Sequence, residues 1–327
     1  MPDNLTEDLL KWYAKKGRQM PWRVKGGAHF DPYAVWISEI MLQQTTVATV
    51  TEYFIRWMKR FPDIKSLAEA SLDEVLLMWQ GLGYYTRARK IHECAKVLIE
   101  QYNGHLPDNR ELLLKLPGIG PYSASSICAF AFNQPETVVD GNVMRVIARL
   151  YGLTQEINRD VIYPLAEKLT SSKQPADYAS AIMDLGATVC LPTHPSCQAC
   201  PWQKNCVAYK KNLTEQIPLI KKPNKTIKTG FVYLITDKKG NYLIQKRTEK
   251  GLLHGLYEFP WDTQKLNFKA KETGLKITHT FTHFKLTLSV LTGQTEQKNL
   301  LFVSPTEFEK YPFSTLMQKV IKKAKLV

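Results

Sequence analysis

The sequence predicts two domains, an all-α domain followed by a smaller α+β domain. Three observations support this fold class. A chain of 327 residues is long enough for two hydrophobic cores. Apolar residues recur at helical spacing from Leu5 to about Ala208. After residue 226 the chain is instead rich in β-branched and aromatic residues that partly alternate. We place the helical domain at 1–210, a basic linker at 211–228 and the second domain at 229–327.

The helical elements follow in order along the first domain. The run "YAVWISEIMLQQTTVATVTEYFIRWMKRF" (33–61) has apolar residues three and four apart and no internal proline. Similar segments, several of them separated by Gly/Pro turns, lie at 72–79, 85–102, 110–115, 123–132, 142–150 and 177–189.

The second domain begins after "NLTEQIPLIKKPNKTIK", a basic stretch with two prolines that we interpret as a linker. Strand-like segments follow: "TGFVYLIT", "GNYLIQKR", "KITHTFTHFKLTLSVLTG" and "NLLFVS". The tail "FSTLMQKVIKKAKL" is typical of a helix.

Composition and charge narrow the class of protein. A hydrophobic content of 44% excludes a disordered or collagen-like chain. The chain has no apolar run of about 18 residues and no signal-peptide core, so we expect a cytoplasmic protein. Of the formal charge of +14, the region 225–327 carries +10. This excess favours a polyanionic partner, nucleic acid before membrane. A solvated lysine-rich surface remains the alternative.

Four of the six cysteines form one cluster with the spacing Cys-x6-Cys-x2-Cys-x5-Cys. They are Cys190, Cys197, Cys200 and Cys206. Disulfides are disfavoured in a cytoplasmic chain, so metal ligation is the better interpretation. Zinc sites usually pair two Cys-x2-Cys units and this run has one, whereas four thiolates can also hold a [4Fe–4S] cluster. The spacing leaves zinc open. It also resembles the cluster loop of the endonuclease III and MutY group of DNA glycosylases.

The stretch "LPGIGPYSA" (116–124) is a Gly-x-Gly turn between two helical segments. Gly118 and Gly120 permit a positive φ and a close backbone approach, and the free N–H groups of the next helix favour an anion. The stretch resembles a helix–hairpin–helix, which grips a DNA phosphate without reading sequence. A tight turn without a ligand is the alternative.

About twenty residues later comes "ETVVDGNVMRV", in which Asp140 can cap the following helix. A hairpin loop followed at this distance by such an Asp resembles the HhH-GPD superfamily of base-excision glycosylases. Members that also cleave the strand carry a lysine two residues after the second loop glycine, which forms a Schiff base with the sugar. This chain has Tyr122 there, and a phenol cannot form an imine.

"VWISEIMLQQT" followed by "GLGYYTRAR" closely resembles the MutY family of adenine DNA glycosylases, and the resemblance covers nearly the whole chain. It implies an iron–sulfur enzyme of base excision repair. Its substrate would be double-stranded DNA in which A is mispaired with 8-oxoguanine or G. We expect a monomer associated with the nucleoid. An endonuclease III-like pyrimidine-lesion glycosylase/lyase is the first alternative, and a noncatalytic DNA-binding protein with a structural metal is the second.

Glu39 lies among Trp36, Ile40 and Met41, where a carboxyl is poorly solvated and remains available as an acid. An exposed Glu on an amphipathic helix would be the ordinary interpretation. By the resemblance, Glu39 protonates a ring nitrogen of adenine and Asp140 stabilises the oxocarbenium-like sugar, which is the two-carboxylate logic of glycoside cleavage. The resemblance gives Tyr122 and Asn142 supporting roles.

The resemblance also implies residues that bind the DNA. Gln44 and Tyr84 match positions that wedge into the base stack, and Leu82 lies beside them. Thr45 matches a position that contacts the opposite base. Ordinary packing or helix surface is the alternative for each of these residues. The adenine pocket comprises Arg18, Met20, Trp22 and Arg23, and Asp184 fits the family pattern. Two features depart from that pattern. Ser180 stands where a glutamine commonly contacts adenine, and the segment between Trp22 and Glu39 is longer than usual.

The second domain resembles the Nudix-like domain of the same family. "HGLYEFP" is present, but the region after it gives only "AKETGL" in place of an Arg-Glu-x2-Glu-Glu helix. Without those carboxylates we expect no divalent-ion cluster and no nucleotide hydrolysis. "HTFTHFKL" resembles the Phe-Ser-His loop that inspects the base opposite adenine, which assigns that role to Phe281, Thr282 and His283. An ordinary strand would satisfy the same letters.

Overall fold

The computed structural model describes residues 4–23, 31–43, 45–219, 225–297 and 299–327. The chain divides into two compact units. One comprises Met1–Ala68 with Glu93–Lys221, and the other Glu69–His92 with Lys222–Val327. No described helix is long and apolar enough to cross a membrane.

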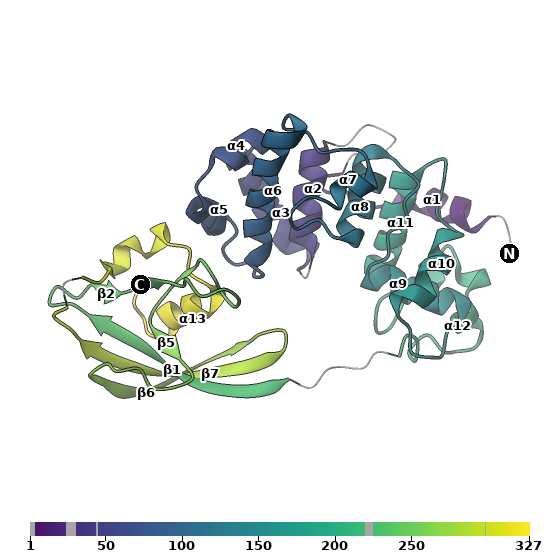
Figure 1. Ribbon diagram of the computed structural model, residues 1–327. Coiled ribbons are helices and arrows are strands. Elements are labelled where there is room, and N and C mark those ends of the chain that lie inside the picture. The colour runs from purple at the N-terminus through teal and green to yellow at the C-terminus, as the bar shows by residue number, and fades with distance from the viewer. Residues whose placement is uncertain (1–3, 24–30, 44, 220–224, 298) are drawn as a thin grey trace. The chain divides into compact units, whose positions relative to one another are not determined.

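The first unit is helical, as the sequence predicts (Figure 1). Its helices are α1 (Leu5–Lys16), α2 (Pro32–Leu42), α3 (Val47–Arg60), α4 (Ile64–Glu69), α7 (Arg110–Leu113), α8 (Pro121–Phe132), α9 (Gly141–Tyr151), α10 (Arg159–Glu167), α11 (Pro175–Thr188) and α12 (Val207–Lys210). Helix α6 (Thr86–Tyr102) crosses the boundary between the units. Helix α11 packs against α1, α8 and α9, and α2 packs against α8. This packing brings the starts of α8 and α9 toward α2.

The run 33–61, expected to be helical throughout, is two helices. Asp31 caps α2 by accepting a bond from the Tyr33 N–H at 3.0 Å, and α2 ends at an extended Gln43. Thr46 then caps α3 through its side chain. The apolar spacing hides this break, because a capping threonine does not interrupt the helical pattern.

The second unit is built on a mixed sheet of order β6-β7-β1-β2-β8, with β5 paired to β1. Its strands are β1 (Thr226–Thr236), β2 (Tyr242–Leu243), β5 (Trp261–Asp262), β6 (Ala270–Thr280), β7 (Phe284–Gln294) and β8 (Phe302–Val303). Strands β3 (Gln245–Lys246) and β4 (Tyr257–Glu258) form a separate pair. Helix α13 (Thr315–Lys323) contacts β6, which confirms the predicted helical tail.

Strand β1 begins at Thr226, inside the stretch expected to be a linker. Its first residues pair in parallel with β7, with Thr226 opposite Phe284. Sequence pattern could not reveal this, because the partner strand lies about sixty residues away and the strand's first four residues are exposed.

The segment 69–92 carries α5 (Leu72–Met78) and contacts the sheet-containing part of its unit. The Gln80 side chain donates to the Phe313 carbonyl at 3.0 Å, and the Lys246 ammonium pairs with Asp73 at 2.5 Å. A turn that carries Leu82 and Tyr84 therefore belongs to the same compact unit as the β6–β7 hairpin.

In the second unit, the resemblance would lead one to look for a carboxylate-bearing helix after the "HGLYEFP" segment. The connection 263–269 between β5 and β6 contains no helix. Glu258, in the "YEFP" segment, is buried and accepts bonds from Arg247 at 2.8 Å and from the Trp261 indole at 2.7 Å. The Glu258 carboxylate thus bonds to two neighbouring side chains inside the unit, and it is too buried to contact a ligand.

Candidate active site

A pocket of about 700 Å³ lies within the first unit, where the ends of several helices meet. The segment before α2, the α2–α3 turn and the starts of α8 and α9 supply its walls, together with α11. Its lining residues are Arg18, Met20, Arg23, Glu39, Leu42, Gln43, Thr45, Thr46, Val47, Tyr122, Val139, Asp140, Gly141, Asn142, Met183 and Ala187. The volume is that of a typical small-ligand site.

Glu39 lies on α2 and is only 7% exposed. Burial raises the pKa of Glu39 to about 7. Hydrogen bonds from Ser126 and Tyr122 and the charge of Arg23 act in the opposite direction, whereas Asp140 adds to the rise. The carboxyl therefore keeps its proton to a higher pH than an exposed glutamate does, and it can both give and take a proton.

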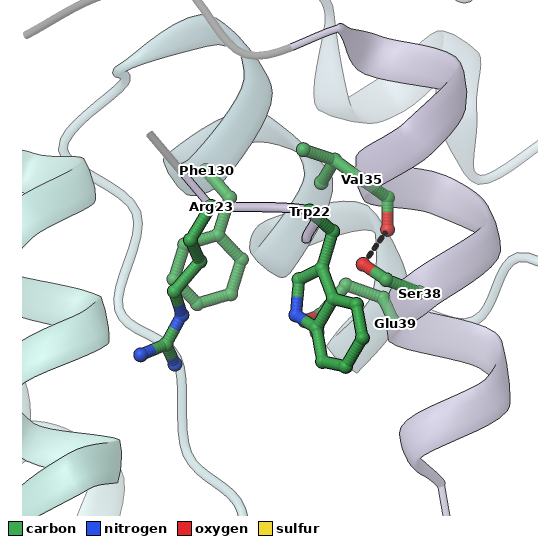
Figure 2. A pocket seen from close by; sticks show the side chains of 6 residues that line it. All are labelled: Trp22, Arg23, Val35, Ser38, Glu39 and Phe130. Carbon is green, nitrogen blue, oxygen red and sulfur yellow. Dashed lines mark hydrogen bonds between the residues drawn. The ribbon is translucent and has the colours of Figure 1, made fainter. Parts of the chain in front are cut away.

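A small pocket of about 10 Å³ lies beside Glu39 and is lined also by Trp22, Arg23, Val35, Ser38 and Phe130. Figure 2 shows the Trp22 ring next to Glu39, and the Ser38 hydroxyl turned back to donate to the Val35 carbonyl at 2.9 Å. The space suffices for about one water molecule. Bulky apolar groups therefore keep solvent away from this side of the carboxyl.

Asp140 caps α9, and its side chain faces the pocket from the helix N-terminus. It accepts bonds from the Val143 N–H at 2.7 Å and from the Asn142 amide at 3.0 Å. The carboxylate oxygens thus lie at the positive end of the α9 dipole, with one backbone and one amide donor bonded to them. Burial, followed by the charges of Glu39 and Asp140, raises the pKa of Tyr122 well above its usual value, so the phenol remains a neutral hydrogen-bond donor.

The pocket thus holds two carboxyl groups in opposite environments. Glu39 is buried and carries a raised pKa in spite of its polar neighbours Ser126 and Tyr122, whereas Asp140 sits at a helix N-terminus with backbone and amide donors. Such a pair can supply an acid and an anion to the same bound molecule.

The segment before α2 is attached to α11 by one buried carboxylate. Asp184 accepts bonds from the Arg18 guanidinium at 2.7 and 3.0 Å, from the Arg18 backbone N–H at 2.8 Å and from Arg23 at 2.8 Å. Asp184 is fully buried and does not line the pocket. Ser180 is also buried; its hydroxyl bonds with Tyr13 and is likewise absent from the pocket wall.

The hairpin loop joins α7 to α8. Gly118 adopts φ +81°, the conformation that glycine permits. Gly120 is the N-cap of α8 at φ −93° and ψ 179°, an extended conformation open to any residue. Of the two glycines, Gly118 therefore uses the positive φ that the sequence allows, and Gly120 does not.

The residues expected to read the opposite base lie in the second unit, except Thr45, which lines the pocket of the first. The Tyr84 hydroxyl is 2.6 Å from the Thr282 hydroxyl, although 198 positions separate them. Tyr84 is 44% exposed and adopts φ +48°, and the Arg87 guanidinium lies over its ring.

The β6–β7 hairpin carries the other residues expected to read the opposite base. Phe281 stacks on Phe284 with ring centroids 4.7 Å apart, beside an exposed His283. Leu82 is half-buried in the same turn as Tyr84, and Gln44 lies outside the described residues.

The four clustered cysteines are free thiols near one another, and α9 supplies two arginines to their loop. Burial, with some repulsion from the neighbouring cysteines, raises the pKa of Cys200 to about 12. Arg149 donates to the Cys190 Sγ at 3.4 Å and to the Leu191 carbonyl at 2.6 Å. Four thiols beside a buried cation have the donor chemistry of a thiolate-bound metal centre. Among the described residues, however, no three His, Cys, Asp or Glu side chains lie close enough to hold a metal.

Sequence reasoning missed Arg145, which links the pocket to the cysteine loop. Its guanidinium donates to the Asn142 side chain at 2.8 Å, to the Gly186 carbonyl at 2.7 Å and to the Cys190 carbonyl at 2.8 Å. The sequence does contain a pattern that indicates this role: Arg145 and Arg149 are four residues apart in a largely apolar helix, so both lie on one face of it. A buried arginine pair of this kind indicates carbonyl or carboxylate partners.

Comparisons with known proteins fit this geometry. Residues 37–171 match the HhH-GPD superfamily base excision DNA repair protein model, and residues 231–323 match the NUDIX domain model. An adenine DNA glycosylase of Buchnera aphidicola is 38% identical, over 86% of this chain and 83% of that protein. The human adenine DNA glycosylase is 33% identical, over 96% of this chain and 72% of that protein. A thermostable thymine-DNA glycosylase structure, 30% identical, aligns with a TM-score of 0.58 over 63% of this chain and 95% of that one.

Proposed function

Because this chain belongs to the MutY family of adenine DNA glycosylases, within the HhH-GPD superfamily, we propose that its substrate is adenine mispaired with 8-oxoguanine or G in duplex DNA. The observation that carries the proposal is the pair of carboxyl groups, Glu39 and Asp140, that line one pocket in opposite environments. The protein acts in base excision repair. We infer that it works as a monomer at the nucleoid in the cytoplasm.

The reaction uses both groups. The adenine must first leave the base stack, because the glycosidic bond is out of reach inside the duplex. Glu39 gives its proton to a ring nitrogen of adenine, and the C1′–N9 bonding pair leaves with the neutral base. The sugar becomes an oxocarbenium-like cation, which the Asp140 carboxylate stabilises. Water then adds to C1′ and loses its proton to Glu39, which restores the acid.

Tyr122 and Asn142 support this chemistry without joining it. The Tyr122 phenol, kept neutral by burial, donates to Glu39, and the Asn142 amide donates to Asp140. Neither can form an imine with the sugar. We therefore infer an enzyme that removes the base and leaves the strand intact.

The opposite base is read by the second unit. The hydrogen-bonded Tyr84 and Thr282 hydroxyls lie beside the stacked Phe281 and Phe284 rings, on a part of the chain with excess positive charge. The exposed Tyr84 ring and the half-buried Phe281 and Phe284 rings offer stacking surfaces for bases, and hydroxyls can meet a base edge. This arrangement supports inspection of 8-oxoguanine or G.

Cys190, Cys197, Cys200 and Cys206 would hold a [4Fe–4S] cluster. When bound, the cluster would tie the four thiolates together and so stabilise their loop. Two observations support this ligand set: the four thiols are free, and Arg149 contacts Cys190 and acts on Cys197 and Cys206.

Single-turnover excision from duplexes that contain A opposite 8-oxoguanine, A opposite G, or A opposite T tests the proposal. We expect adenine release from the first two and little from the third. Glu39→Gln and Asp140→Asn should each lose excision by at least about a hundredfold while they retain binding to the duplex. Excision at the wild-type rate in either variant contradicts the assigned roles. Strand cleavage without added base would instead favour the lyase alternative.

A further inference from the structure

The wall of the pocket formed by residues 18–23 has no helix or strand of its own. Met20 and Trp22 are nevertheless 7% and 5% exposed. A segment without a helix or strand has no regular backbone hydrogen bonds to hold it in place. Side-chain contacts must therefore fix residues 18–23 against the rest of the unit. Trp22 packs edge-on against Phe54 at 5.2 Å, which holds the middle of the segment.

Both polar ends of the segment are held by Asp184. Arg18 makes three hydrogen bonds to this carboxylate and Arg23 makes one, all between 2.7 and 3.0 Å. Burial acts to raise the pKa of Asp184, but Arg23 and Arg18 outweigh it, so the group remains ionised. A fully buried carboxylate with four donors has little capacity left for a further ligand.

Arg23 also lies near Glu39, although its guanidinium is directed to Asp184. It lines both the large pocket and the small one beside Glu39, and its charge lowers the pKa of that carboxyl. The other ionisable groups that act on Glu39 are Asp140 from α9 and Tyr122 from α8. The bond to Asp184 therefore fixes the distance at which a positive charge acts on the proposed acid.

We propose that Asp184 is a positioning residue for adenine excision that acts through Arg18 and Arg23 and does not contact the base. It holds the pocket wall against α11 and keeps the Arg23 guanidinium from pairing with Glu39. This inference rests on the proposed role of Glu39, and it gives Asp184 a role other than the base contact that its place in the adenine-pocket motif suggests.

Asp184→Asn tests the inference, with Asp160→Asn, an exposed carboxylate on α10, as the matched control. We expect single-turnover excision to fall about tenfold or more in Asp184→Asn and to remain at the wild-type rate in Asp160→Asn. Arg23, once released, approaches Glu39 and stabilises its ionised form, so the alkaline limb of the pH–rate profile should move to lower pH. Arg23→Gln removes the positive charge, and its limb should move to higher pH. This second variant keeps the test decisive if Asp184→Asn does not fold.

A purine nucleotide that lacks the 6-amino group separates positioning from direct contact. If Asp184 acts only through the arginines, the ratio of adenine to purine excision is the same in Asp184→Asn and the wild type. A changed ratio shows that the carboxylate reads the amine and overturns the inference. A lower melting temperature with an unmoved pH limb and an unchanged rate overturns it as well. If Glu39→Gln retains excision, the proposed function fails independently of these outcomes.

Discussion

Replacing Glu39 by glutamine separates the chemical role of this carboxyl from its effect on stability. Its pKa rises from 4.5 to about 7 in the folded chain, a shift of about 2.5 pH units, or about 3 kcal/mol at 1.36 kcal/mol per unit. The folded state binds this proton more tightly than the unfolded state, so the contribution of Glu39 to stability is greatest below pH 4.5 and is lost as the pH rises through 7. Glutamine is neutral at every pH and avoids this loss.

The variant should therefore gain stability where it loses function. We expect the free energy of unfolding of Glu39→Gln to exceed the wild-type value by about 3 kcal/mol at pH 8 and by less than about 1 kcal/mol at pH 5. Urea unfolding at the two pH values measures the difference, and Glu52→Gln on the exposed side of α3 is the control. Equal differences at both pH values would refute the argument that the buried carboxyl is charged at a cost.

Three further predictions concern other parts of the chain. Cys200→Ser should remove bound iron and visible absorption from the purified protein and lower its melting temperature, as measured by metal analysis and calorimetry. Thr282→Val and Tyr84→Phe should each reduce the preference for A opposite 8-oxoguanine over A opposite G, and the double variant should lose little more, because both delete the same 2.6 Å bond; additive losses would show independent roles. Gly186→Ala would place a Cβ 2.7 Å from the Cβ of Asn142, so we expect a loss of about 1–3 kcal/mol in urea unfolding together with slower excision; wild-type values in both measurements would mean that α11 and α9 can separate freely.

The sequence predicted the two kinds of architecture and some of the residues that line the pocket, among them Glu39, Tyr122 and Asp140, because both depend on local pattern and motif. Glu39 among apolar residues and Asp140 before a helix could each be recognised from a few neighbours. That both face a single pocket depends on the packing of α2, α8 and α9, which the motif resemblance anticipated and the structure supplies.

Long-range partners were beyond the reach of the pattern. The early start of β1 depends on a parallel partner, and the four bonds to Asp184 join positions more than 160 residues apart. The resemblance grouped Asp184 with the adenine-binding residues. A position in a sequence motif does not say in which direction the carboxylate points. Burial and hydrogen-bond partners decide this, and both exist only in the folded chain.

The cap formed by Asp140 has a consequence for how this position can change over generations. One carboxylate both closes the end of α9 and faces the pocket. No single substitution keeps both roles. Asn retains the helix cap but loses the negative charge, whereas Glu retains the charge on a side chain that is too long for the same cap. Every substitution at position 140 therefore loses at least one role, and we expect this residue to vary far less among related sequences than the exposed residues of the same helix.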